Sequence, residues 1–253
     1  MVSRPRSGGT ALSQIKPRGG SSGILGVDIG GTHLKAAVVD ARGKLLTNKV
    51  SVDTPYPNTP DIMLRALVDL LKPLQAYDRI AIGFPGVVRK DKVLTAPHFD
   101  IKAWADFPLA AELSRRLGGY PAKLINDAEM QGLYVIKGRG LELVLTLGTG
   151  AGTALFLEGK LTPHLELAQH PIHKKKTYND YVGDKALKKI GKHRWNKRVR
   201  KTVGILHALL FYDHLFIGGG NSAHIEGDLP DTITLVSNDA GIEGAAALWR
   251  DSD

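Results

Sequence analysis

The strongest pattern along the chain is an apolar run that breaks at glycines and then resumes. Residues 24–39 follow this pattern, with the break at Gly30–Thr32, and residues 141–157 repeat it with the break at Gly148–Gly150. Two apolar strands joined by so short a connection are typical of a hairpin. We therefore predict two β-hairpins, each with a glycine loop at its tip.

Further strands and helices alternate around both hairpins. Spacing and turn residues predict helices at 61–74, 109–117, 128–136, 195–210 and 240–249, and strands at 44–52, 79–84, 122–125, 215–217 and 232–236. We expect Asp61 to cap the first helix. This alternation predicts an α/β fold with two related lobes and a cleft between their glycine loops. The expected lobes are residues 23–125, completed by the C-terminal helix 240–250, and residues 126–239.

Composition narrows the class of protein. The 253 residues are 43% hydrophobic and 23% charged, as in ordinary globular proteins, and contain no cysteine. Disulfides, iron–sulfur clusters and a cysteine nucleophile are therefore excluded. No run of 18 apolar residues is present and the N-terminus lacks an apolar signal segment. We expect a cytoplasmic protein whose residues 1–22 form a disordered basic leader.

The net charge of +9 is unevenly distributed. Residues 174–201 contain twelve Lys and Arg against two Asp, whereas the chain outside this segment and the leader is acidic. A solvated face is one interpretation of the segment, and a site for a polyanion is another. Aromatic residues for base stacking are sparse there, so nucleic acid is the weaker candidate.

The glycine loops also suggest chemistry. Adjacent glycines let backbone N–H groups approach an anion, and Thr32 adds a hydroxyl. Asp28, at the end of the preceding strand, is placed to hold a hydrated Mg²⁺. A plain tight hairpin is the alternative for one such loop. A third glycine loop, Gly218–Asn221, also follows an apolar strand, and three such loops favour phosphate binding.

Several motifs together resemble the ROK (repressor, open reading frame, kinase) family. They are DIGGT at 28–32, GFPGVV at 83–88, LINDA at 124–128, TLGTG at 146–150, PHLEL at 163–167 and IGGGN at 217–221. The resemblance covers about residues 24–250 and is greatest to the polyphosphate glucokinase branch. It implies two ribonuclease H-like lobes of the actin and hexokinase type. The implied activity is phosphoryl transfer from ATP or inorganic polyphosphate, with Mg²⁺, to a hexose, most simply to the 6-hydroxyl of glucose.

The resemblance also assigns residues to roles. Asp127 matches the catalytic base, although Asp at a helix start is also typical of an N-cap. The sugar site would comprise Asn126, Asp127, Glu166, His170 and Gly86. The phosphate donor would contact Asp28, Gly30, Gly31, Thr32, Gly148, Thr149, Gly150, Gly218, Gly219, Gly220 and Asn221. For a long polyphosphate, Lys174, Lys175 and Lys176 would extend this contact.

Some positions depart from the family pattern. Without cysteine, we expect no structural zinc. The family's Glu-x-Gly-His appears with Ala168 and Gln169 in the Gly-His places, and His98 stands where an asparagine is common. His164 and His33 are more simply explained as structural or solvated residues, and a surface carboxylate is the alternative for Glu166.

Two other function classes stay open beside the kinase. One is a non-catalytic sugar sensor, although the leader is too short for a helix-turn-helix domain. The other is a nucleic-acid-associated protein that uses residues 174–201. We expect a homodimer whose ligands are a hexose and a phosphate donor, with no membrane partner.

Overall fold

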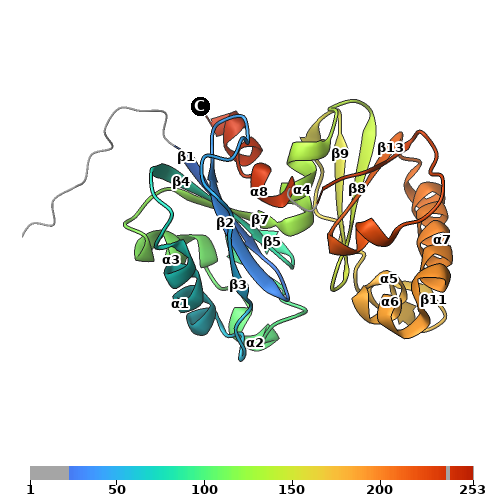
Figure 1. Cartoon of the computed structure of the whole chain (residues 1–253), viewed down its shortest axis with the longest axis horizontal. Helices are drawn as coiled ribbons and strands as arrows, with labels where there is room; N and C mark the ends of the chain where they lie inside the picture. The colour runs from blue at the N-terminus through green and yellow to red at the C-terminus, as the bar shows by residue number, and fades with distance from the viewer. Residues whose placement is uncertain (1–22, 238–239, 253) are drawn as a thin grey trace, which may run out of the picture.

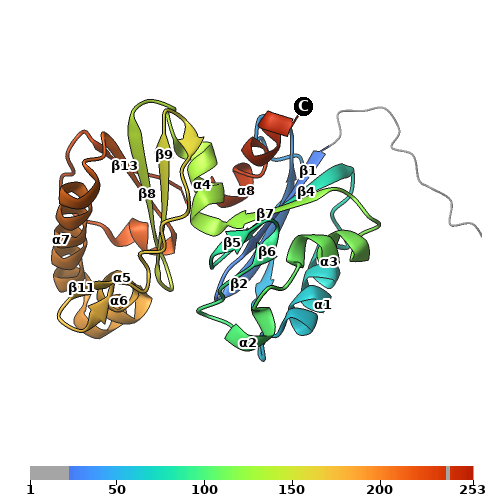
Figure 2. The same ribbon diagram turned by 180° about the vertical axis from the view of Figure 1, so that it is seen from behind.

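The computed structural model describes residues 23–237 and 240–252. The leader predicted at 1–22 lies outside the described residues. Two five-stranded sheets stand side by side, with helices on their outer faces and between them (Figures 1 and 2). Within the described part of the chain, no helix combines the length and the apolar character needed to cross a bilayer.

The first sheet has the strand order β3-β2-β1-β4-β7. Its strands are β1 Gly23–Ile29, β2 His33–Val39, β3 Val50–Asp53, β4 Tyr77–Phe84 and β7 Ala122–Asn126. The first three pair in antiparallel fashion, whereas β4 and β7 continue the sheet in parallel with β1. Consequently β1, β4 and β7 end at the same edge.

The second sheet repeats this arrangement in the order β10-β9-β8-β13-β14. Its strands are β8 Leu141–Leu147, β9 Ala151–Leu157, β10 Lys160–Leu161, β13 His214–Gly218 and β14 Ile233–Leu235. Again the first three are antiparallel and the last two parallel to β8. The predicted fold, α/β with two related lobes, is confirmed, as are both predicted hairpins.

Helices bury one apolar face of each sheet. Helices α1 Pro60–Leu71 and α3 Leu109–Arg116 lie on the first sheet, where fully buried Trp104 of α2 Ile101–Trp104 joins the core. Helices α5 Tyr178–Val182, α6 Asp184–Ile190 and α7 Lys192–Leu210 cover the second sheet around buried Trp195. The short elements outside the two large sheets include β5 Val88–Arg89, β6 Lys92–Val93, β11 Pro171–His173, β12 Lys176–Thr177 and the 3-10 helix η1 Gly220–His224.

Between the sheets lie α4 Asp127–Val135 and α8 Ala240–Glu243. Helix α4 contacts β4 and β7 of the first sheet as well as β8 and β9 of the second. Helix α8 packs on α4, β1 and β2, and Ile242 and Ala245 join a core cluster with Ile24 and Met130. The C-terminal segment therefore packs on the first sheet, although it follows the second in sequence.

Three element predictions need correction. Helix α1 has Thr59 as its N-cap and Pro60, favoured at N1, as its first residue, so Asp61 lies inside the first turn. The closing helix expected at 240–249 is confined to the short α8 and is followed by the 3-10 helix η2 Ala247–Ser252; Gly244, a residue of low helix propensity, lies between them. The strand expected at 44–52 is shorter than predicted, since β3 comprises only residues Val50–Asp53.

Candidate active site between the two sheets

A cavity of about 440 Å³ lies where the two hairpin loops and the start of α4 meet. This volume suits a small-molecule site. Its lining includes these predicted residues: Asp28, Gly30, Gly31, Thr32, Gly86, Asn126, Asp127, Gly148, Thr149, Gly150, Glu166, Gly219, Gly220 and Asn221. The structure thus brings together residues that lie almost two hundred positions apart in sequence.

The two glycine loops face each other across the cavity. Thr32 Oγ1 lies 3.4 Å from Thr149 Oγ1, so the loop tips touch. The Gly148 carbonyl accepts from Asn221 Nδ2 at 3.1 Å and from the Asp184 backbone N–H at 2.9 Å. The second loop is therefore held by the third glycine loop on one side and by α6 on the other.

Asp127 is the first residue of α4, and its neighbour Asn126 takes the N-cap position. The Asn126 side chain accepts from the backbone N–H groups of Ala128 and Glu129, at 2.9 and 3.3 Å. Asn126 therefore supplies the cap, and Asp127 keeps a carboxylate that lines the cavity and accepts from the Ala128 N–H at 2.8 Å. The N-cap of α4 is thus Asn126, and not Asp127, for which a capping role was the alternative interpretation.

The pKa of Asp127 is raised from 3.8 to about 7. Burial is the largest cause, followed by the nearby charge of Asp28, while the Ala128 N–H opposes the rise and Glu166 adds to it. A carboxyl group with a pKa near neutrality can take up and release a proton under physiological conditions. The site therefore contains a group suited to general base chemistry.

Asp28 is the other carboxylate deep in the cavity. Burial raises its pKa, and the Lys35 ammonium, from the paired position on β2, works in the opposite direction. The described residues contain no group of three or more His, Asp or Glu side chains that could hold a metal ion. A single carboxylate still fits Mg²⁺, which commonly binds one or two carboxylates together with substrate phosphates and water.

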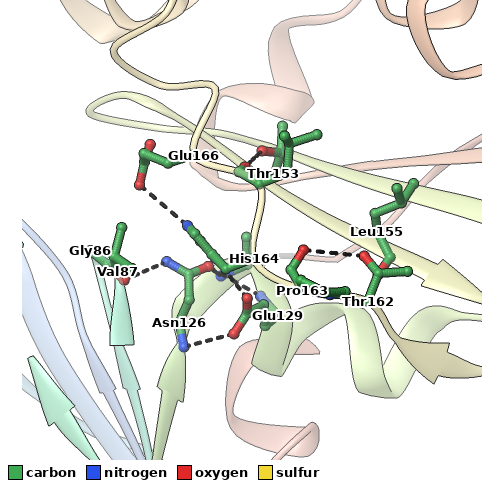
Figure 3. A network of polar contacts seen from close by, with 12 residues as sticks. Gly86, Val87, Asn126, Glu129, Thr153, Leu155, Thr162, Pro163, His164 and Glu166 are labelled. Carbon is green, nitrogen blue, oxygen red and sulfur yellow. Dashed lines mark hydrogen bonds and ion pairs between the residues drawn. The ribbon is translucent and has the colours of Figure 1, made fainter. Parts of the chain in front are cut away.

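Two further lining residues, Asn126 and Glu166, belong to one polar network (Figure 3). Asn126 Nδ2 donates to the Gly86 carbonyl at 3.1 Å, which joins the loop after β4 to the start of α4. His164 lies between Glu129 and Glu166, with its Nδ1 2.6 Å from Glu129 Oε1. Asn126 therefore has two roles: it caps α4, and through its bond to Gly86 it holds another lining residue of the cavity in place.

His98 lines the same cavity. Burial lowers its pKa, the Lys185 ammonium lowers it further, and Glu166 opposes the change. The ring is therefore predominantly neutral at physiological pH, able both to donate and to accept a hydrogen bond. The resemblance described above led us to expect an asparagine at this place, and its side chain has the same dual capacity.

Five of the predicted site residues lie outside the cavity lining: Gly218, His170, Lys174, Lys175 and Lys176. His170 is exposed, with its ring centroid 6.4 Å from that of Tyr178. The three lysines are exposed on the β11–β12 hairpin. Their predicted roles stay predictions.

Sequence reasoning missed several lining residues, among them Lys35, Gln131, Asn179 and Lys188. Asn179 Oδ1 accepts from the Ala151 N–H at 2.8 Å and so holds the end of the second glycine loop. Lys188 of the basic segment pairs with Asp184 and lines the cavity. Two of these residues had a sequence signal: Lys35 faces Asp28 across the expected hairpin, and Lys188 lies in the basic segment 174–201.

The family model of the ROK family matches residues 24–164, more than half of the chain. Together with the repeated sheet and the cavity between the two loops, this match shows that the chain belongs to the ROK family.

Similar proteins of known activity include sugar kinases. Polyphosphate glucokinase of Mycobacterium tuberculosis is 27% identical over 237 residues, which cover 88% of this chain and 89% of that protein. N-acetylmannosamine kinase of Shigella flexneri is 34% identical over 143 residues, 54% of this chain and 48% of that protein.

Solved structures show the same fold. The inorganic polyphosphate/ATP-glucomannokinase of Arthrobacter sp. strain KM superposes with a TM-score of 0.80 at 30% identity, covering 89% of this chain and 97% of that one. The ROK family glucokinase of Streptomyces griseus, in complex with glucose and AMPPNP, gives a TM-score of 0.76 at 22% identity over 91% of this chain and 100% of that one.

Proposed function

We propose that this protein is a hexose kinase that transfers a phosphoryl group from ATP or inorganic polyphosphate, with glucose as the first acceptor to test. The observation that carries the proposal is Asp127. Its carboxylate lines the cavity with a pKa raised to about 7, and glycine loops from both sheets lie on the same cavity. Family membership and the named activities of the relatives add support.

In the proposed reaction, the acceptor hydroxyl gives its proton to the Asp127 carboxylate. The oxygen then forms a bond to the terminal phosphorus of the donor, and the bond from that phosphorus to the bridging oxygen breaks. The shortened donor leaves with the electron pair of that bond. A base with a pKa near 7 is half ionised at neutral pH, which suits both receipt and later release of the proton.

The donor phosphates would lie between the loops Gly30–Thr32 and Gly148–Gly150. Their backbone N–H groups and the hydroxyls of Thr32 and Thr149 are donors suited to phosphate oxygens. Mg²⁺ near Asp28 would neutralise charge on the donor. If ATP is the donor, Gly218–Asn221 would lie on the adenosine side.

Polyphosphate would continue beyond the loops along the basic segment. Helix α6 is bonded to the Gly148 carbonyl through the Asp184 N–H, and Lys188 of that helix lines the cavity. A polyanion leaving the loops in this direction would meet Lys188 first and further cations of residues 174–201 afterwards. The favourable contribution of such a row grows with the length of the anion.

The sugar would lie against Glu166, Asn126 and His98. Glu166 offers a carboxylate that can accept from two hydroxyls at once. His98, in place of asparagine, and Ala168, in place of glycine, are the two differences at this wall that bear on which hexose fits. The experiment below therefore compares several hexoses as phosphoryl acceptors.

The test is a coupled assay of the purified protein with ATP and with polyphosphate in parallel, each with glucose, mannose and N-acetylmannosamine. We expect sugar-dependent phosphate transfer from at least one donor, with glucose among the acceptors. No transfer to any hexose from either donor would reject the proposal. Sugar binding without transfer would favour the non-catalytic sensor, and gel filtration of the same sample would check the expected homodimer.

A further inference from the structure

A chain of three charged side chains runs from helix α4 to the wall of the cavity. His164 Nδ1 lies 2.6 Å from Glu129 Oε1, and His164 Nε2 lies 3.4 Å from Glu166 Oε2 (Figure 3). Of these three residues, only Glu166 lines the cavity. The imidazole therefore lies directly behind the carboxylate that faces the ligand space.

Both ring nitrogens of His164 face carboxylate oxygens, which decides the charge of the ring. A neutral imidazole can donate from one nitrogen only, whereas the imidazolium donates from both. The pKa of His164 is raised to about 9, first by the hydrogen bond with Glu129 and then by that with Glu166. The ring is therefore a cation at neutral pH, held between two anions.

Glu129 fixes the inner end of this chain. Its side chain is only 8% exposed, and its second oxygen, Oε2, accepts from the Asn126 backbone N–H at 3.3 Å as part of the capping box of α4. A buried carboxylate without a cationic partner is costly. The pairing therefore holds the ring of His164 against the start of the helix that carries Asp127.

Glu166 is held at both oxygens. Oε1 accepts from the Ala168 backbone N–H at 3.1 Å, and Oε2 faces His164. A carboxylate has about four acceptor positions, so each oxygen keeps capacity for a further donor. The two fixed contacts leave that remaining capacity directed at the cavity.

We propose that His164 is a positioning residue, which holds Glu166 in the orientation in which it accepts hydrogen bonds from two hydroxyls of the sugar. This inference rests on the proposed function, since it takes a hexose as the ligand. His164 itself contacts no substrate in this proposal. Its effect is that the long Glu166 side chain is ordered before the sugar arrives, so binding does not have to order it.

A double-mutant cycle tests whether His164 acts through Glu166. We expect His164→Gln to raise the sugar KM roughly tenfold, the scale of one hydrogen bond to a charged group. The donor KM and kcat at saturating sugar should stay within about threefold. In a Glu166→Gln background, the same His164→Gln change should have almost no further effect on the sugar KM.

Any of three results would overturn the proposal. One is an unchanged sugar KM in the His164→Gln variant. Another is an equal rise of the sugar KM with and without Glu166, which would mean that His164 acts independently of that carboxylate. A proportional fall of kcat with every substrate would likewise show a merely structural role.

Matched variants guard against loss of folding. Glu129→Gln preserves the capping box, because glutamine also serves at this position, but removes the charge that holds His164. It should raise the sugar KM in the same direction, by less. His214→Gln is the control for loss of a histidine, since His214 bonds Thr234 Oγ1 at 2.8 Å and does not line the cavity, and it should leave the sugar KM unchanged. If His164→Gln does not fold, Glu129→Gln decides the test.

Calorimetric titration with hexose in the absence of donor separates this inference from the proposed function. A wild type that binds hexose without phosphorylating it would reject the kinase, while the weaker binding expected for His164→Gln would still support the positioning role. A wild type that neither binds nor phosphorylates hexose would reject both.

Discussion

Replacing Asp127 with asparagine should abolish most of the activity and, at the same time, stabilise the fold above neutral pH. Asparagine is nearly isosteric and can still accept from the Ala128 N–H, so the start of α4 should survive. It cannot take the hydroxyl proton, and loss of a positioned base typically costs about 10²–10⁴-fold in rate. We expect kcat to fall by that factor, with the sugar KM much less affected.

The opposite effect on stability follows from the raised pKa. Because the folded protein binds this proton more tightly than the unfolded chain does, stability falls as pH rises from about 4 to about 7. The difference between about 7 and the ordinary 3.8 corresponds to about 4 kcal/mol at most, at about 1.4 kcal/mol per pH unit. A neutral asparagine avoids this cost, so above pH 7 the free energy of unfolding of the variant should rise relative to that of the wild type.

Two measurements check this. Initial rates against pH should show the wild-type kcat falling below about pH 7, as Asp127 becomes protonated, and urea unfolding at pH 5 and pH 8 should show the relative gain of the variant. Asp69→Asn is the control, since Asp69 is exposed on α1 and pairs with Lys72. Wild-type kcat in Asp127→Asn, or a stability difference that is the same at both pH values, would refute the reasoning.

Three further predictions concern other parts of the molecule. Neutralising the exposed lysines at 174–176 together should raise the KM for polyphosphate and scarcely change the KM for ATP. The rise in KM should shrink as the salt concentration increases. Equal changes for both donors would mean that this hairpin is only a solvated surface. Gly219→Ala should lower the thermal midpoint and kcat, because Gly219 has φ 82° and a Cβ there would collide with the Leu147 backbone, whereas Gly220→Ala, with open space at that position, is the milder control. Because the pKa of His164 is raised to about 9, its contribution to the free energy of unfolding is complete below about pH 6.5 and is lost as pH rises through about 9. In urea titrations, His164→Gln should therefore lower the free energy of unfolding less at pH 10 than at pH 6. An equal loss at both pH values would contradict the assignment of a charged ring.

Much of the fold could be predicted because its signals are local. Each hairpin shows apolar strands on both sides of a glycine break, and the spacing of the two copies implies repeated lobes. The boundaries that failed were set by packing. Asp61 was expected to cap α1 from its residue type, but Pro60 occupies N1 and the cap is Thr59, two positions earlier.

The candidate site divides in the same way. The loops Gly30–Thr32 and Gly148–Gly150 and the carboxylate Asp127 could be found because glycine and aspartate stand directly after strands. The significance of His164 could not, since its partner Glu129 lies 35 positions earlier and looks, in sequence, like an ordinary helix residue. A histidine becomes informative only when the fold shows which charges surround it.

The location of α4 has a mechanical consequence. It touches two strands of each sheet, so it stands at the fulcrum of any rotation of one sheet against the other. The loop tips at Thr32 and Thr149 belong to different sheets, so such a rotation would part them where they now touch. Asp127, at the start of α4, belongs to the helix on which both sheets pack. If the cavity opens in this way to admit a substrate, the two loops would separate from each other while the Asp127 carboxylate stays with the helix that joins the two sheets.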